Sequence, residues 1–164
     1  MSRNIVNTAK FQLHPDLDGG DQDETPRLLG MADQALNYIR SFKWAPPVKR
    51  LYLAFAVGDV MALFLAEFEH AIKGGPDEAL WIVVGDMPPA YFIVDESPNA
   101  DKALDAYCGL MEEWAESVLA GGDLSQCYPI AAAPTTEHAK MLLSRMKQVR
   151  AKFIPFAKRG VVVP

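Results

Sequence analysis

The chain has 164 residues, of which 50% are hydrophobic and 23% are charged, and its formal net charge at pH 7 is −5. This composition excludes a disordered chain, and the length is typical of a single domain with its own core. The negative charge disfavours nonspecific binding to nucleic acid or to anionic lipid.

The usage of cysteine and the absence of long apolar runs predict a cytoplasmic protein. Cys108 and Cys127 are too few for a disulfide framework and belong to no Cys-x-x-Cys motif, so we expect two reduced thiols. No apolar run approaches the roughly 18 residues of a membrane span, and no signal segment is apparent. We also expect no cofactor and no metal, because the sequence has no phosphate-binding glycine loop and no metal-ligand spacing among its histidines.

The first 24 residues show no sustained periodicity and are rich in aspartate and glycine towards their end. The alternation of aspartates resembles a calcium loop, but a count from Asp16 puts Asp21 and Arg27 where such a loop needs Gly and Glu. We therefore predict a mobile acidic segment over residues 1–24 and a single domain over residues 25–164.

A first helix is predicted from Thr25, as the N-cap, with Pro26 in the first turn. The apolar residues that follow recur at intervals of three and four: Leu28, Leu29, Ala32, Ala35, Leu36 and Ile39. We expect this helix to run to about Phe42, because residues 44–47 contain two prolines.

The centre of the chain contains two apolar runs, residues 51–57 and 80–84, that each end in Val-Gly-Asp. Apolar residues return after each tripeptide, over residues 60–68 and 90–94. This pattern predicts two consecutive hairpins and hence a four-stranded antiparallel β-meander, apolar on both faces. A buried helix over residues 60–72 is the alternative, since the Ala and Leu content there favours helix.

Two further helices are predicted after the meander. One starts at residues 97–99 and ends at Gly121, and the other starts at Thr135 or Thr136 and runs to Pro155. The predicted fold is therefore α+β, a four-stranded meander with one N-terminal and two C-terminal helices packed on it. The apolar residues 161–163 are expected to dock on a sheet edge or to pair with another subunit.

Asp59 and Asp86 are candidate site residues, because each follows an odd-numbered strand and both would lie at the same end of the meander. Two carboxylates that lie close together can shift each other's pKa and support acid–base or metal chemistry. The alternative is structural, since Asp and Gly are ordinary turn residues.

A pocket between the sheet and the helices is a second hypothesis, for a small-molecule-binding protein or an enzyme with Asp59 or Asp86 as the polar group. Its lining would be aromatic: Trp81, Tyr91, Tyr107 and Trp114. The same four residues are equally suited to an ordinary core.

The leading functional hypothesis is protein–protein binding or self-association, with a possible homodimer, through the C-terminal tail and the sheet edges. It is motivated by the missing catalytic motif and by the apolar surplus. Nucleic-acid binding is a further alternative, because basic residues gather in the last helix and tail against the single acid Glu137: Lys140, Arg145, Lys147, Arg150, Lys152, Lys158 and Arg159. The alternative is that the macrodipole favours cations near a helix C-terminus, and the negative overall charge argues against nucleic acid as a partner.

Overall fold

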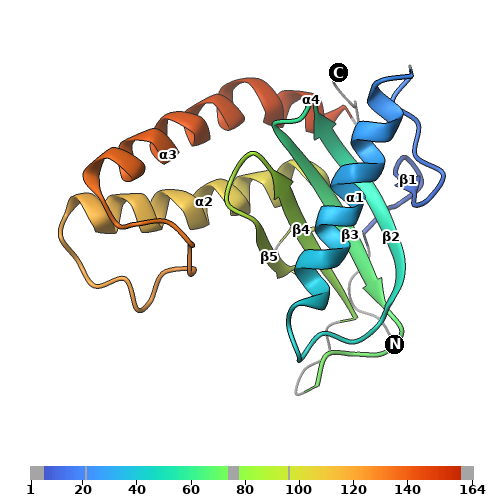
Figure 1. Ribbon diagram of the computed structural model, residues 1–164, viewed down its shortest axis with the longest axis horizontal. Coiled ribbons are helices and arrows are strands. Elements are labelled where there is room, and N and C mark those ends of the chain that lie inside the picture. The colour runs from blue at the N-terminus through green and yellow to red at the C-terminus, as the bar shows by residue number, and fades with distance from the viewer. Residues whose placement is uncertain (1–5, 21, 74–77, 96, 160–164) are drawn as a thin grey trace.

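The fold is known from a computed structural model, which describes residues 6–20, 22–73, 78–95 and 97–159 (Figure 1). The elements, in chain order, are β1 (Gln12–Leu13), α1 (Glu24–Arg40), β2 (Val48–Val57), β3 (Met61–Phe68), β4 (Ala79–Gly85), β5 (Ala90–Ile93), α2 (Ala100–Leu119), α3 (Thr136–Gln148), a π-helix (Val149–Phe153) and α4 (Ile154–Lys158). The predicted α+β class is confirmed.

The sheet has five antiparallel strands in the order β1-β2-β3-β4-β5, and β2 to β5 are the predicted meander. The alternative helix over residues 60–72 is wrong, because β3 pairs with neighbours on both sides: Phe64 lies opposite Leu53 on β2 and Ile82 on β4. The apolar run of β3 is continuous because each of its faces meets a separate core.

The fifth strand, β1, was not predicted. Gln12 pairs with Leu53 and Leu13 pairs with Tyr52, and the His14 N–H donates to the carbonyl of Leu51 at 2.9 Å. Two residues are too few to produce a recognisable alternation of apolar and polar side chains.

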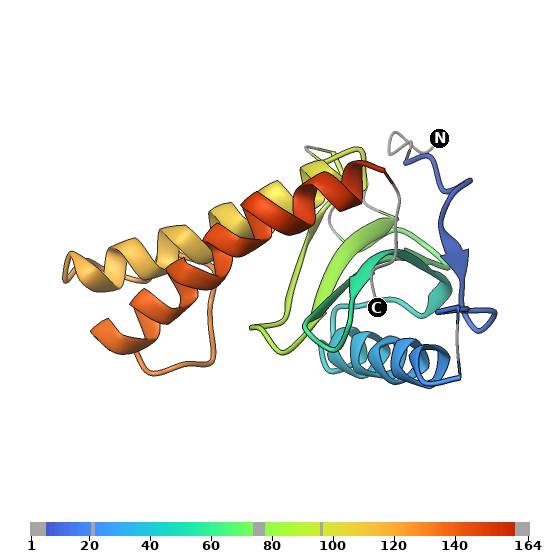
Figure 2. The same cartoon turned by 90° about the horizontal axis from the view of Figure 1, so that it is seen from above.

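Helices cover both faces of the sheet, as its apolar content requires (Figure 2). Ala62, Phe64 and Ala66 of β3 belong to the core on the α1 side. Met61, Leu63 and Leu65 alternate with them and belong to the core on the side of α2 and α3. The sheet is therefore the middle layer of three.

The starts of α2 and α3 are confirmed with their caps. Asn99 accepts the N–H of Lys102 at 3.1 Å, and Thr135 accepts the N–H of His138 at 3.2 Å. Thr25 is not the N-cap of α1 as predicted, because the helix begins at Glu24 and the Thr25 hydroxyl instead accepts the N–H of Gly19 at 3.1 Å.

The last helix does not end at Pro155 as predicted. The π-helix follows α3 directly, its carbonyl at Val149 accepts the N–H of Ile154, and α4 then carries the chain through Pro155. A proline has no N–H and its ring crowds the carbonyl four residues earlier, so a regular α-helix breaks there. The wider π turn just before Pro155 accommodates that residue.

The α2–α3 pair extends beyond the sheet as an arm (Figures 1 and 2). The connection over residues 120–135 leaves α2 at the far end of this arm and runs back to the sheet, where Tyr128 contacts Tyr91. Leu119, at the end of α2, is 41% exposed, and Met141 is 54% exposed. No described helix is long and apolar enough to cross a membrane. The apolar tail at residues 161–163 lies outside the described residues.

Candidate functional site

The two Gly-Asp turns lie side by side at one end of the sheet, as the meander predicted. In the β2–β3 turn the Val60 N–H donates to the Val57 carbonyl at 3.0 Å, and the Asp86 N–H donates to the Val60 carbonyl at 2.8 Å. Asp59 is exposed in its turn and is not among the described residues that line the hollow beside Asp86. The structure therefore brings the two turns together, but of the two carboxylates only that of Asp86 is among the described residues that line this hollow.

Gly85 makes the close approach of the turns possible. Its φ is +131°, and a Cβ atom there would lie 2.4 Å from the Val60 carbonyl oxygen and 2.7 Å from the Cα of Met61. A side chain fits neither this conformation nor this space. The position of the loop that carries Asp86 thus depends on the absence of a Cβ at residue 85.

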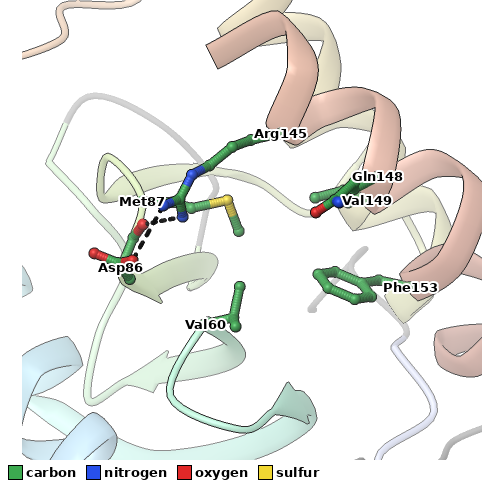
Figure 3. A pocket seen from close by; sticks show the side chains of 7 residues that line it. All are labelled: Val60, Asp86, Met87, Arg145, Gln148, Val149 and Phe153. Atoms are coloured by element: carbon green, nitrogen blue, oxygen red, sulfur yellow. Dashed lines mark hydrogen bonds and ion pairs between the residues drawn. The ribbon is translucent and has the colours of Figure 1, made fainter. Parts of the chain in front are cut away.

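Arg145 of α3 reaches across to the same loop (Figure 3). Its Nη1 donates to the Asp86 carbonyl at 2.7 Å, and its Nη2 lies 3.2 Å from Oδ2 of the Asp86 carboxylate. The Asp86 side chain is 74% exposed and that of Arg145 is 42% exposed. An ion pair this exposed contributes little stability, so the short main-chain contact is the firmer of the two.

A hollow of about 270 Å³ lies between the loop and α3 (Figure 3). It is lined by both apolar and polar side chains, and the π-helix supplies two of the apolar ones; the lining residues are Val60, Asp86, Met87, Arg145, Gln148, Val149 and Phe153. The polar groups are the Arg145 guanidinium, the Gln148 amide and the Asp86 carboxylate.

Two more hollows border the same loop. One, of about 200 Å³, shares Arg145 with the first and is lined by Asp86, Met87, Pro88, Trp114, Ile130, Ala132, His138, Leu142 and Arg145. The other, of about 370 Å³, lies along the loop between residues 85–89 and residues 130–132. All three share Asp86 and Met87, and we call them together the Arg145 groove.

The four predicted aromatic residues do not line one pocket. Trp81 and Tyr107 are buried in the core on the α2 side, where the Trp81 Nε1 donates to the Ser97 carbonyl and the Tyr107 hydroxyl donates to the Pro88 carbonyl, each at 2.7 Å. Burial raises the pKa of Tyr107. Trp114 borders the Arg145 groove. Tyr91 packs on the α1 side.

Tyr91 belongs instead to an aromatic cluster at the outer edge of the sheet. Neighbouring ring centroids in this cluster are 5.0 to 6.3 Å apart, and its members are Tyr38, Phe42, Trp44, Tyr91 and Tyr128. The Tyr128 hydroxyl accepts the Tyr91 N–H at 3.1 Å and shares a hydrogen bond with the Tyr38 hydroxyl at 2.9 Å. Part of the open edge of β5 is therefore capped, while Trp44 remains 36% exposed.

The basic residues of α3 and the π-helix are partly neutralised within the chain. Arg145 pairs with Asp86, and Arg150 pairs with Asp105 and, through two bonds of 2.7 and 2.9 Å, with Glu112. Five further exposed cations of the described chain lie in or beside these helices: Lys140, Lys147, Lys152, Lys158 and Arg159. The basic pattern thus includes two arginines that pair with acidic side chains of the same chain.

Two other chemistries have little support in the described part of the chain. No three His, Cys, Asp or Glu side chains of the described residues gather as metal ligands. Cys108 is buried, and desolvation raises the pKa of its thiol to about 12, so it is not a thiolate nucleophile near neutral pH.

Sequence reasoning named Asp86 and Trp114, which border the groove, but it missed the central role of Arg145. Arg145 was one basic residue in a row of them, and only the packing of α3 against the β4–β5 loop distinguishes it. Nothing in the sequence beyond their apolar character indicated that Ile130, Val149 and Phe153 line the groove.

Comparisons with protein-family models, with known proteins and with solved structures give no match. The groove is therefore interpreted from its own geometry.

Proposed function

We propose that this chain is a protein-binding protein whose Arg145 groove receives a segment of a partner protein. The observation that carries this proposal is that three hollows border one loop, and that two of them share a partly exposed guanidinium, that of Arg145. They are open to solvent, whereas a small-molecule site encloses most of its ligand. An extended segment of another protein suits such a surface.

The enzyme alternative has less support. It uses Asp59 or Asp86 as the polar group of a pocket between the sheet and the helices; of the two, only Asp86 is among the described residues that line the groove, and its side chain is 74% exposed. His138 borders the groove, but its Nδ1 is 3.0 Å from the Ala133 carbonyl, within its own connection. A general base needs a partner within hydrogen-bond reach in the site, and the groove offers no such pair among its described lining residues.

Selection of peptides from a random phage-displayed library tests the proposed function. The wild-type chain is compared with Ala132→Trp, which fills the groove from an exposed lining position, and with Ala133→Trp, an adjacent exposed position outside the lining. We expect a shared set of peptides to be enriched on the wild type and on Ala133→Trp and to be lost on Ala132→Trp. Enrichment that Ala132→Trp leaves intact contradicts the proposal.

Self-association is a second candidate function, and the aromatic cluster favours it. Trp44, which packs on Tyr91 of the outer strand β5, is 36% exposed, and Ile93 in the same strand is 43% exposed. Because the Tyr128 hydroxyl occupies the Tyr91 N–H, a second copy would dock on the aromatic side chains rather than extend the sheet at that residue. A homodimer formed in this way leaves the Arg145 groove available.

A further inference from the structure

We infer that the Arg145 groove recognises a carboxylate flanked by apolar side chains, in an acidic segment of a partner protein, and that this carboxylate replaces that of Asp86 on Arg145. The inference rests on the proposed function and names the chemistry of the partner. In the unbound chain Asp86 occupies the position of the partner's acid.

Arg145 makes two contacts with Asp86, and they have different roles. The contact with the carbonyl fixes the loop, and the contact with the carboxylate is the one that a partner's anion can replace. Nη1 holds the Asp86 carbonyl at 2.7 Å, and this bond does not depend on the Asp86 side chain. The carboxylate contact is longer, at 3.2 Å, and the side chain that makes it is 74% exposed. The Asp86 carboxylate can therefore turn into solvent while the loop stays in place.

Arginine suits this exchange because the guanidinium stays charged and presents its donors in a planar fork that matches a carboxylate. Asp86 is the only acidic side chain among the described residues that line the three hollows. Once its carboxylate has turned away, the charge of the groove is complementary to an anion.

The apolar walls define what lies next to that carboxylate. Met87, Val149 and Phe153 line the hollow on one side of Arg145, and Trp114, Ile130 and Leu142 line the hollow on the other side. A partner residue on each side of the acid can bury apolar surface there. Nucleic acid is a poorer fit, because it needs a row of cations, and Lys140 and Lys147 do not line the groove.

The test is an NMR titration of the ¹⁵N-labelled chain with two probes, acetyl-Phe-Glu-Leu-amide and acetyl-Phe-Gln-Leu-amide. At low salt we expect the acidic peptide to shift the amides of Met87 and Val149 and to bind about five to ten times more tightly than its neutral counterpart. Asp86→Asn removes the competing charge and should tighten binding of the acidic peptide further, by about two- to fivefold.

Variants on α3 assign the preference to one side chain. Arg145→Gln should abolish the difference between the peptides, and Arg145→Lys, which keeps the charge but not the fork, should retain only part of it. Lys147→Gln removes the same charge from an exposed position outside the groove lining and should leave the preference unchanged. Amide spectra and thermal unfolding establish that each variant is folded.

The outcomes separate the inference from the proposed function. Equal affinity for both peptides, or weaker binding of the acidic peptide by Asp86→Asn, overturns the inference and leaves groove binding standing. If neither peptide shifts the groove amides at millimolar concentration, the proposed function fails as well. Binding of oligothymidylate that Lys147→Gln weakens as strongly as Arg145→Gln also overturns the inference, in favour of a nucleic-acid surface.

Discussion

Gly85 sets the position of the loop that carries Asp86, and its replacement should be costly. In Gly85→Ala the new Cβ would meet the Val60 carbonyl at 2.4 Å, in a backbone conformation with φ of +131°. We expect a loss of at least about 2 kcal/mol in the free energy of unfolding, measured with denaturant.

Gly109→Ala is the matched control for this change. Gly109 lies within α2, and a Cβ there meets no atom within 4 Å. Alanine favours a helix over glycine, so this variant should gain about 0.5–1 kcal/mol. A Gly85→Ala variant as stable as the wild type would contradict the account of the loop.

Tyr107 should make stability depend on pH in the alkaline range. Burial raises its pKa in the folded chain above the ordinary tyrosine pKa of about 10. The contribution of Tyr107 to the free energy of unfolding is therefore fully present below about pH 10 and is lost as pH rises through the pKa of the folded chain. Each such tyrosine lowers the free energy of unfolding by up to about 1.4 kcal/mol per pH unit in that window.

Tyr107→Phe should therefore flatten the decline of stability above about pH 10. It should also cost about 1 kcal/mol at pH 7, where the hydrogen bond to the Pro88 carbonyl is lost. The measurement is denaturant unfolding from pH 7 to pH 11. An alkaline slope equal to that of the wild type would contradict the assignment.

At the scale of elements, Arg150 of the π-helix holds that segment to α2 through Asp105 and Glu112. Its two-pronged contact with Glu112 is stronger than a typical surface pair, although the side chain is 38% exposed. Arg150→Gln should lower the free energy of unfolding by about 1 kcal/mol at low salt and by less in 1 M NaCl. Lys152→Gln, at an exposed neighbouring position, should change little. If the two variants had equal effects, the contacts of Arg150 with Asp105 and Glu112 would not stabilise the fold.

Tyr128 fixes the long connection between α2 and α3 to the edge of the sheet. Tyr128→Phe removes the acceptor of the Tyr91 N–H, so the exchange of that amide hydrogen should accelerate by between about threefold and tenfold. Tyr38→Phe removes the neighbouring hydroxyl but keeps the bond to Tyr91, and should leave the exchange rate unchanged. Unaltered exchange in Tyr128→Phe would show that another group protects the amide.

The elements that we predicted correctly from the sequence are those that carry a clear local pattern of apolar, turn or capping residues. The two hairpins and the helices after them follow from apolar runs, Gly-Asp turns and the caps at Asn99 and Thr135. The strand β1 and the passage of the last helix through Pro155 were missed, because each depends on contacts that local sequence does not encode.

At the scale of the whole molecule, self-association should depend on the aromatic cluster. Sedimentation velocity over a range of concentrations should reveal a reversible dimer, and Trp44→Ser should weaken it by about tenfold. Leu119→Ser alters a similarly exposed apolar residue at the far end of the arm and should leave the dimer intact. A monomer at every concentration would refute this second function, and so would equal effects of the two variants.

The groove itself could be predicted only in part. The sequence places Asp86 at the end of a strand, but it does not reveal that Arg145, 59 residues later, meets it there. That contact depends on how α3 packs across the end of the sheet, whereas Asp59 is exposed in its own turn and is not among the described residues that line the groove. The spacing of residues along a chain does not predict which side chains of distant elements meet in a site.

The most direct measurement of the central claim is amide shift mapping of the wild-type chain with the strongest peptide from the library selection. The account predicts that the perturbed amides cluster at Asp86, Met87, Arg145 and Val149, which surround the groove. Perturbations that cluster instead at Phe42, Trp44 and Tyr91 would place the partner on the aromatic cluster and contradict it.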